Sequence, residues 1–413
     1  MKQSIFCLTL LVFGFVIVEA IHKNEQKRFL PKRHVLNLDL PPYERWNHIL
    51  DQHDASYIYK ALHKLMNVYL GSKSLIPILQ EMAVKLLPYF SQPYADELKG
   101  ISDHTGLSLG DVILGNIVYD VTAFNRTNFH LTSLLSEGTG LLNSLGLSGS
   151  KILSSLGGSN LLSTLENKGS SILSRLGSSG ANGSSLFGDL QNLKLCTSIV
   201  AMDKNNRMIH ARNMDYETIH EYLKRVTIEV DFQKNGQTVF TGTTFVGFIG
   251  ITTGYRREAY TVSGDQRNVG KITQNIQSFI KGGEFAFFQL RTVLEKERTF
   301  HSALLSLVRT RTVGGVYFIL GGVRPGEGVI IVRSQKEAIG VVGIPRHGWY
   351  VLETNYDPWN PVPTSDNRRG AAITMLNKIG KNRISPLKLF NVLSTPPVFN
   401  FDTVYTLHCY YAS

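Results

Sequence analysis

A segment rich in glycine, serine and leucine divides this chain into two parts with different secondary-structure patterns. Residues 125–193 contain few aromatic side chains, and a Leu-x-x-Leu unit recurs in them at irregular spacing. Because a solenoid needs a fixed period, this segment is predicted to be a low-complexity insertion rather than a repeat domain. Short amphipathic turns that touch lipid are the alternative interpretation. The folded core is therefore expected to come from the residues on either side.

The part before the insertion carries apolar residues at helical spacing, which predicts helices over residues 43–121. Ser108 is the predicted N-cap of the helix that contains Val112–Val121. Residues 21–40 are basic and extended, and the Pro41-Pro42 pair ends them. Most of the apolar stripes are expected to pack in the core, with a lipid-facing surface as the alternative for a minority.

The part after the insertion has strand patterns at both ends and helical patterns between them. Cys196–Met202 and Arg207–Asn213 flank the turn signal Asp203–Asn206, and Val226–Phe232 precedes the hairpin signal Asn235-Gly236. Further strands are predicted at 237–241, 245–251, 259–262, 316–321, 328–333, 349–354 and 403–408, and helices at 271–281, 284–297, 299–308, 367–378 and 386–394. Such blocks favour two sheets layered with helices over alternating βαβ units.

The N-terminus predicts the compartment. Lys2 precedes the uncharged run Ser4–Val18, and Val18-Glu19-Ala20 offers a small-residue cleavage site. A membrane span needs about 20 apolar residues, so residues 1–20 are predicted to be a signal peptide of a secreted or lysosomal protein. The sequons at Asn125 and Asn182 are candidate glycosylation sites in that compartment, and chance occurrence is their alternative.

Composition excludes several classes of protein. Three cysteines are too few for a disulfide-dense scaffold. The formal net charge of +11 favours phosphate groups or an anionic lipid surface, but lysine and arginine are spread along the chain, so no nucleic acid partner is expected. No His-x-x-x-His or Cys-x-x-Cys spacing occurs, and we expect no metal and no cofactor.

One group of residues has the pattern of a nucleophilic site. Cys196 opens a strand, and the hairpin that follows returns Arg212 and Asp215 toward it. An arginine lowers the pKa of a nearby thiol, and an aspartate accepts a hydrogen bond from an amine or a thiol. The alternatives are a small buried cysteine and a surface ion pair. Asn355, at a strand end, is either an oxyanion donor or a turn residue.

Many short motifs, in one order, resemble a known family. They are Leu40-Pro-Pro-Tyr-Glu-Arg-Trp46, Cys196-Thr-Ser-Ile-Val200, His210-Ala-Arg-Asn-Met-Asp215, Thr241-Gly-Thr-Thr-Phe245 and Glu353-Thr-Asn-Tyr-Asp357. Between about Leu40 and Leu407 the chain resembles the acid ceramidase and N-acylethanolamine-hydrolysing acid amidase family of N-terminal-nucleophile hydrolases. The stretch that begins at Thr241 is similar to the acid amidase branch in particular.

The resemblance implies an α+β fold, an αββα sandwich with an added N-terminal helical subunit. It implies a cut between Leu195 and Cys196, which separates an α-subunit region at 21–124 from a catalytic β subunit at 196–413. Cys196 would then be both the nucleophile and the new N-terminus, and its α-amine, with a usual pKa of about 8, would act as the base. By the same resemblance, four residues support it: Arg212 and Asp215 orient Cys196, Asn355 contributes to the oxyanion hole, and Arg368 holds the site.

The implied reaction is hydrolysis of N-acylethanolamines to a fatty acid and ethanolamine through a thioester. Hydrolysis of ceramide and a non-catalytic lipid-binding role are the alternatives. The expected partners are long-chain acyl amide lipids, a membrane surface, and the second subunit of an α/β heterodimer cut from one precursor. Two positions depart from the family pattern: Gln266 replaces a glutamate, and Thr252, a candidate substrate-lining residue, replaces an aromatic side chain. Gln266 and the short C-terminus are the features that favour the non-catalytic alternative.

Overall fold

The computed structural model of this chain describes residues 4–10, 30–54, 56–70, 76–123 and 196–412. It contains two β-sheets. The five-stranded sheet has the order β1 (Ser4–Leu10), β13 (Thr403–Ala412), β4 (Met208–Asp215), β3 (Thr197–Met202) and β12 (Tyr350–Glu353). The eight-stranded sheet has the order β11 (Ala338–Gly343), β10 (Gly328–Arg333), β9 (Val316–Gly322), β8 (Tyr260–Gln266), β7 (Thr253–Arg256), β6 (Gln237–Phe245), β5 (Thr227–Lys234) and β2 (Lys32–Asn37).

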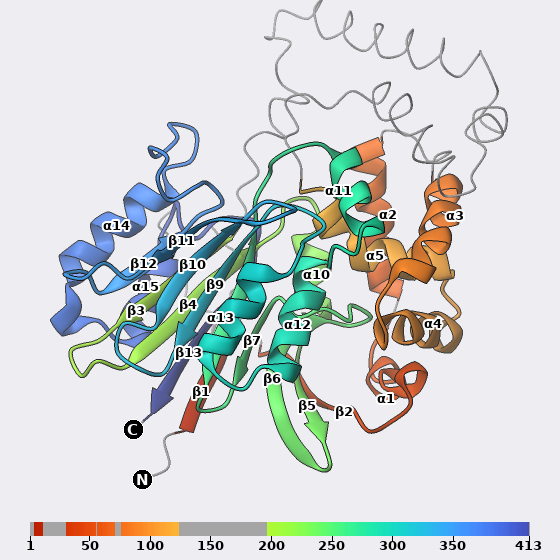
Figure 1. Ribbon diagram of the computed structural model, residues 1–413, viewed down its shortest axis with the longest axis horizontal. Helices are drawn as coiled ribbons and strands as arrows, with labels where there is room; N and C mark the ends of the chain where they lie inside the picture. Colours follow the sequence, from red (N-terminus) through yellow and green to blue (C-terminus); the bar gives the residue numbers. More distant parts are fainter. Residues whose placement is uncertain (1–3, 11–29, 55, 71–75, 124–195, 413) are drawn as a thin grey trace, which may run out of the picture.

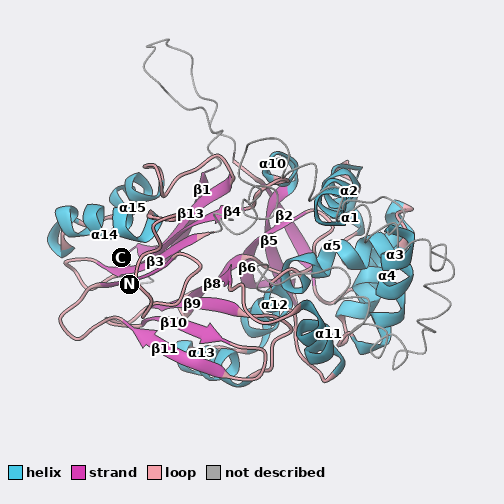
Figure 2. Ribbon diagram, turned by 90° about the horizontal axis from the view of Figure 1, so that it is seen from above, coloured by secondary structure: helices cyan, strands magenta, loops and turns pink. Residues whose placement is uncertain are grey.

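The two sheets pack face to face between two layers of helices (Figure 2). Successive side chains of a strand point to opposite faces, and β3 shows the consequence. Val200 packs between the sheets with Ile319 and Val332, whereas Ile199 packs with Ala372 and with side chains of the next helix along the chain. The outer helices are α14 (Arg368–Ile379) and α15 (Pro386–Leu393) on the smaller sheet, and α11 (Ile272–Ile280), α12 (Ala286–Lys296) and α13 (Phe300–Arg309) on the larger one. The predicted αββα architecture is confirmed.

The N-terminal part is a group of helices beside the sandwich, coloured orange in Figure 1. They are η1 (Pro42–Glu44), α1 (Asn47–Leu50), α2 (Ser56–Leu70), α3 (Ile76–Leu86), η3 (Leu87–Tyr89), α4 (Tyr94–Thr105) and α5 (Leu109–Val121). The predicted N-cap is confirmed, because the Ser108 hydroxyl accepts the backbone N–H of Asp111 at 3.1 Å. After the insertion, α10 (His220–Val226) and η6 (Lys381–Arg383) are the remaining helices among the described residues. None of the described helices is long and apolar enough to cross a membrane.

The predicted strand at 245–251 is wrong. The chain leaves β6 at Phe245 and turns, with the Phe248 N–H donating to the Phe245 carbonyl at 2.9 Å. Gly247 makes this turn possible because it adopts a φ of +78°, which other residues avoid. The strands β7 and β11 were not among the predicted elements. β7 pairs with β6 and β8, and β11 pairs with β10.

The ends of the chain add edge strands. β2, within the segment predicted to be extended, pairs parallel with β5, and β1 pairs antiparallel with β13. Cleavage after Ala20 would remove β1 and leave β13 as the sheet edge. The predicted insertion at 125–193, with both sequons, and Leu195 lie outside the described residues, as does much of the predicted signal peptide.

A buried ion pair joins the N-terminal helices to the sandwich. Arg291 of α12 donates two hydrogen bonds to the Glu97 carboxylate of α4, at 2.5 and 2.7 Å, and neither side chain is exposed. Arg45 and the Trp46 indole donate to the same carboxylate at 3.0 and 2.7 Å. Bidentate, charge-assisted hydrogen bonds of this kind are the strong ones. Glu97 therefore ties three separate segments of the chain together.

Glu97→Gln is expected to destabilise the protein by about 3–5 kcal/mol, because it leaves buried arginines without a counter-charge. Urea or thermal unfolding measures the loss. Asp96→Asn is the control, since the Asp96–Lys99 pair next along α4 is exposed at both side chains and its loss should cost less than about 1 kcal/mol. Equal losses in the two variants would contradict the role assigned to Glu97.

Candidate active site

The register of the β3–β4 hairpin brings the predicted site residues together. Ser198 lies opposite Arg212, and Thr197 lies opposite Asn213. Cys196 immediately precedes β3, so the side chain of Arg212 reaches back along the hairpin to it. The Arg212 Nη2 group donates to the Cys196 sulfur at 2.8 Å. The predicted approach of Arg212 to Cys196 is thus present in the structure.

Cys196 is a fully buried free thiol in a strained backbone conformation. Its φ is +29°, within the region that costs a non-glycine residue about 1–3 kcal/mol. The Arg368 guanidinium donates to its carbonyl oxygen. Burial raises the pKa of the thiol to about 12, and the nearby Arg212 charge acts in the opposite direction. The thiol of the uncut chain is therefore protonated at physiological pH.

A second carboxylate, Asp265 of β8, completes the surroundings of Arg212. Arg212 approaches Asp265 Oδ1 at 3.2 Å and donates to the Thr252 carbonyl at 2.9 Å. Ser198 also donates to Asp265 Oδ1, at 3.0 Å. Burial raises the Asp265 pKa to about 6, with Arg212 opposing the shift. Asp265 was not a predicted site residue, although it directly precedes Gln266, one of the two positions that depart from the family pattern.

Asp215 lies on the other side of the sulfur and has an unused acceptor. Its Oδ2 atom accepts from Asn400 Nδ2 at 2.9 Å, whereas Oδ1 is buried without a hydrogen-bond partner among the described residues. The backbone carbonyl of Asp215 lies 4.0 Å from the Cys196 sulfur. Burial raises the Asp215 pKa to about 6, and the charge of Arg368 opposes this shift. Asp215 Oδ1 is therefore placed to accept a hydrogen bond from the α-amine that a cut before Cys196 would form.

Arg368 and Asn355 meet on the carbonyl side of Cys196. Arg368 opens α14 and donates to the Thr354 carbonyl at 2.9 Å and to Asp366 Oδ2 at 2.6 Å. It also donates to Asn355 Oδ1 at 3.4 Å. Asn355 has a φ of +68°, and its Nδ2 group donates to the Gln266 carbonyl at 2.9 Å. The structure therefore brings Asn355 to the site but uses its amide donor within the protein.

The two positions that depart from the family pattern have structural partners. The Gln266 amide donates to the Tyr119 carbonyl at 2.8 Å and to the Thr122 hydroxyl at 3.3 Å, which links β8 to the end of α5. Thr252 is buried, and its hydroxyl lies 2.7 Å from that of Tyr405. Among the described residues, no group of three or more histidine, cysteine, aspartate or glutamate side chains is placed to hold a metal ion.

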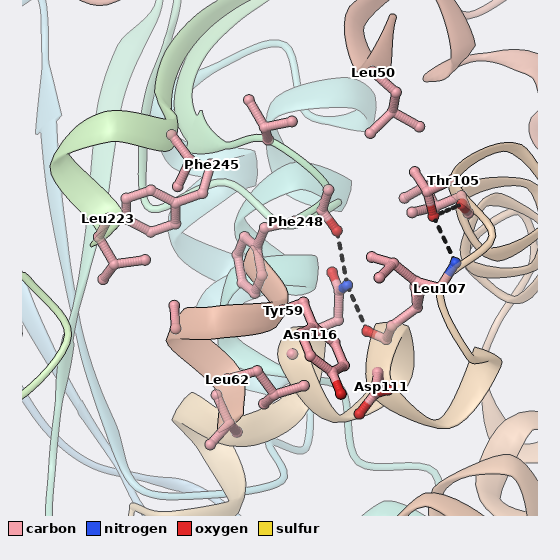
Figure 3. A pocket seen from close by; sticks show the side chains of 18 of the residues that line it. Leu50, Tyr59, Leu62, Thr105, Leu107, Asp111, Asn116, Leu223, Phe245 and Phe248 are labelled. Atoms are coloured by element: carbon pink, nitrogen blue, oxygen red, sulfur yellow. Dashed lines mark hydrogen bonds between the residues drawn. The ribbon is translucent and has the colours of Figure 1, made fainter. Parts of the chain in front are cut away.

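An apolar cavity lies between the N-terminal helices and the sandwich (Figure 3). It contains about 720 Å³ of space that includes part of the open solvent. Its walls come from α2, α4, α5, α10 and the turn after β6; the lining includes Leu62, Leu107, Gly115, Val118, Leu223 and Phe248. Asn116 closes one side by donating to the Gly247 carbonyl at 3.0 Å. Thr252 is not among the lining residues of this cavity.

Two family models match the chain on either side of the insertion. Residues 30–90 match the beta subunit of N-acylethanolamine-hydrolyzing acid amidase. Residues 196–373 match the linear amide C–N hydrolases of the choloylglycine hydrolase family, and this match begins at Cys196. The first match lies within residues 21–124, which were predicted to be an α-subunit region, whereas the matching model is named for a beta subunit.

Relatives are similar over nearly the whole chain. The N-acylethanolamine-hydrolyzing acid amidase of Cavia porcellus is 31% identical over 383 residues, which cover 91% of this chain and 86% of the relative. The acid ceramidase of Pan troglodytes is 31% identical over 395 residues, covering 90% and 82%. A solved Caenorhabditis elegans ortholog of the acid amidase is 35% identical, covers 51% of this chain and 92% of its own, and has a TM-score of 0.48.

Gln266→Glu is expected to make stability depend on pH, because a carboxylate cannot donate to the Tyr119 carbonyl. Burial will raise the pKa of the introduced carboxyl, so its stability contribution is present at low pH and is lost as pH rises through that pKa. The expected loss is about 1–3 kcal/mol at neutral pH, and most of it disappears in acid.

Thermal unfolding across the acid-to-neutral range measures this effect. Gln274→Glu is the matched control, because Gln274 is exposed and its side chain accepts from the Lys271 N–H at 2.9 Å, a role that a carboxylate keeps. A loss in Gln266→Glu of equal size at both ends of the pH range would contradict the prediction.

Proposed function

This chain belongs to the family of linear amide hydrolases that contains N-acylethanolamine-hydrolyzing acid amidases and acid ceramidases, and from that premise we propose that it hydrolyses N-acylethanolamines after self-cleavage before Cys196. The chain is thus an amide-hydrolysing enzyme. The observation that carries the finer proposal is the setting of Cys196. Arg212 donates a hydrogen bond to its sulfur, and the match to the linear amide hydrolases begins at this same cysteine.

Self-cleavage needs only groups of the chain and water. The Cys196 sulfur attacks the carbonyl carbon of Leu195, the peptide C–N bond breaks, and the nitrogen takes up the thiol proton. Water then hydrolyses the thioester, which leaves a carboxyl group at Leu195 and a free thiol and amine at Cys196. The strained φ of Cys196 favours this step, because the cut removes the peptide bond that defines it.

The new α-amine supplies the base that the buried thiol lacks. In the proposed cycle it takes the proton of Cys196 while the sulfur bonds to the substrate carbonyl carbon and the carbonyl electron pair moves to oxygen. When that pair returns, the amide C–N bond breaks and ethanolamine leaves with the proton. Water, deprotonated by the same amine, then attacks the thioester, and the fatty acid leaves as the sulfur recovers its proton. The free Oδ1 atom of Asp215 is the acceptor that would hold the amine in place.

The apolar cavity is the proposed acyl-chain site. The cavity opens to solvent and its lining is mostly apolar, which is the lining that an acyl chain needs. Val118 lines it, and the next residue of α5, Tyr119, receives a hydrogen bond from Gln266 beside Asp265. In this proposal the cavity holds the one long chain of an amide such as palmitoylethanolamide. Ceramide, which carries a second long chain, is the comparison substrate.

Buried acids support an acidic compartment, and we propose lysosomal or secreted localisation through the predicted signal peptide. Burial raises the pKa of Asp215 and Asp265 to about 6, of Asp120 to about 7 and of Glu353 to about 8. Raised carboxyl pKa values contribute stability that is present at low pH and is lost as pH rises through these values. Glycosylation at Asn125 and Asn182 and binding to an anionic membrane surface belong to the same proposal.

We expect wild-type protein to gain a new N-terminus at Cys196 and Cys196→Ala to stay intact, because the variant lacks the attacking sulfur. Intact mass and N-terminal sequencing at acid and neutral pH follow the cut. Hydrolysis of palmitoylethanolamide should fall on the order of 10⁴-fold or more in the variant. The proposal would be contradicted by a folded wild type that is never cut before Cys196, or by a Cys196→Ala variant that is cut there. The unfolding temperature of the variant shows whether it is folded.

The cavity predicts acyl-length selectivity. A Cβ atom added at Gly115 meets only Leu62 Cδ2, at 4.0 Å, so Gly115→Ala should keep activity and stabilise α5 by about 0.5–1 kcal/mol. Gly115→Leu should fill the cavity and raise KM for palmitoylethanolamide about tenfold, with a smaller effect on a short-chain homologue. Kinetics on a series of acyl lengths test this, and an unchanged chain-length preference in Gly115→Leu would place the acyl site elsewhere.

A further inference from the structure

The hydroxyl group of Tyr119 is buried and has no hydrogen-bond partner among the described residues. Its side chain belongs to α5 and is 4% exposed. Other buried tyrosines satisfy their hydroxyls: that of Tyr260 donates to the Val293 carbonyl at 2.9 Å, and that of Tyr317 donates to Asp357 at 2.8 Å. Because an unsatisfied buried hydroxyl costs about 1–3 kcal/mol, the position of Tyr119 requires an explanation.

The contacts of Tyr119 place it beside the strands that carry Asp215 and Asp265. Its ring packs against Phe287, with centroids 4.2 Å apart, and lies 6.4 Å from the ring of Tyr216, the residue after Asp215. Its carbonyl is bound by Gln266, the residue after Asp265. The titratable groups that affect the pKa of the phenol are Cys196, Asp265, Arg212 and Asp120. Tyr119 thus lies next to Tyr216 and Gln266, each of which follows a carboxylate of the site, and its hydroxyl makes no hydrogen bond to the sulfur.

The chemistry of this hydroxyl is restricted to donation. Burial raises its pKa well above the usual value, and the neighbouring Cys196 and Asp265 raise it further, so the phenol keeps its proton. A neutral phenol in a dry site donates to negative charge. The predicted oxyanion donor, Asn355 Nδ2, gives one of its two N–H groups to the Gln266 carbonyl at 2.9 Å. A free donor for the reacting carbonyl is therefore available at Tyr119.

We propose that Tyr119 is an active-site residue whose hydroxyl donates a hydrogen bond to the oxyanion formed when Cys196 attacks the substrate amide. The inference deepens the proposed function and rests on it. As the sulfur–carbon bond forms, the carbonyl electron pair moves to oxygen, and Tyr119 stabilises that charge without giving up its proton. The pair returns to the carbonyl when the C–N bond breaks and the amine leaves. The N-terminal fragment then contributes a group to the reaction and must stay bound after the cut.

Tyr119→Phe tests this, because it removes the hydroxyl and keeps the ring that packs against Phe287. With palmitoylethanolamide, kcat should fall about 10²-fold, the effect of losing one oxyanion donor. KM should change little, since the hydrogen bond is made in the transition state. Self-cleavage is scored separately, and kcat is expressed per molecule with an N-terminal Cys196, so that slow maturation is not counted as slow hydrolysis.

Tyr260→Phe is the matched control: it removes a buried tyrosine hydroxyl that bonds to the Val293 and Glu297 carbonyls, away from the site. It should lower the unfolding temperature and leave kcat unchanged. An unchanged kcat in Tyr119→Phe, or a change confined to KM, would overturn the inference while the proposed function stands. A matured wild type that hydrolyses no acyl amide would overturn the proposed function and the inference with it.

Discussion

A single buried guanidinium, that of Arg212, joins the two sheets at the nucleophile. It extends from β4 of the five-stranded sheet, binds the Cys196 sulfur, and reaches the Thr252 carbonyl and Asp265 on the side of the eight-stranded sheet. Neither Arg212 nor Asp265 is exposed, and each charge opposes the effect of burial on the other. The position of the sulfur therefore depends on the packing of both sheets, and a change in that packing would also move the site.

The charge balance of the site explains why a cut before Cys196 would complete it. In the uncut chain, Asp215 and Asp265 are both buried with pKa values raised to about 6, and each has an oxygen without a hydrogen-bond partner among the described residues. Release of the Cys196 amine in the proposed reaction adds a positive charge next to Asp215. An opposite charge within a few ångströms favours the ionised carboxylate. The cut thus supplies one amine with two roles: while protonated it favours the ionised form of Asp215, and once neutral it is the base for the Cys196 thiol.

Local rules placed some of the predicted residues, whereas the site roles of Asn355 and Arg368 were predicted through the family resemblance. Ser108 caps its helix, and the Cys196 hairpin follows from a turn signal and brings Arg212 and Asp215 to the sulfur. Asp265 and Tyr119 reach the same place through tertiary packing, because they come from β8 and α5, and no local pattern encodes that approach. The prediction of a strand at 245–251 was wrong for a local reason: the apolar residues of this segment favoured a strand, whereas Gly247 makes a turn there.

The position of the insertion follows from how its flanks are held. Before it, Asp120 at the end of α5 accepts the Ala286 N–H at 2.7 Å, and Asn275 donates to the Ala123 carbonyl at 3.1 Å. After it, Cys196 is held by Arg212 and Arg368. With both ends fixed by the folded core, the length of the connecting chain has little effect on the site. Doubling a loop costs only about 0.6 kcal/mol in closure entropy, so a long segment is tolerated immediately before the nucleophile.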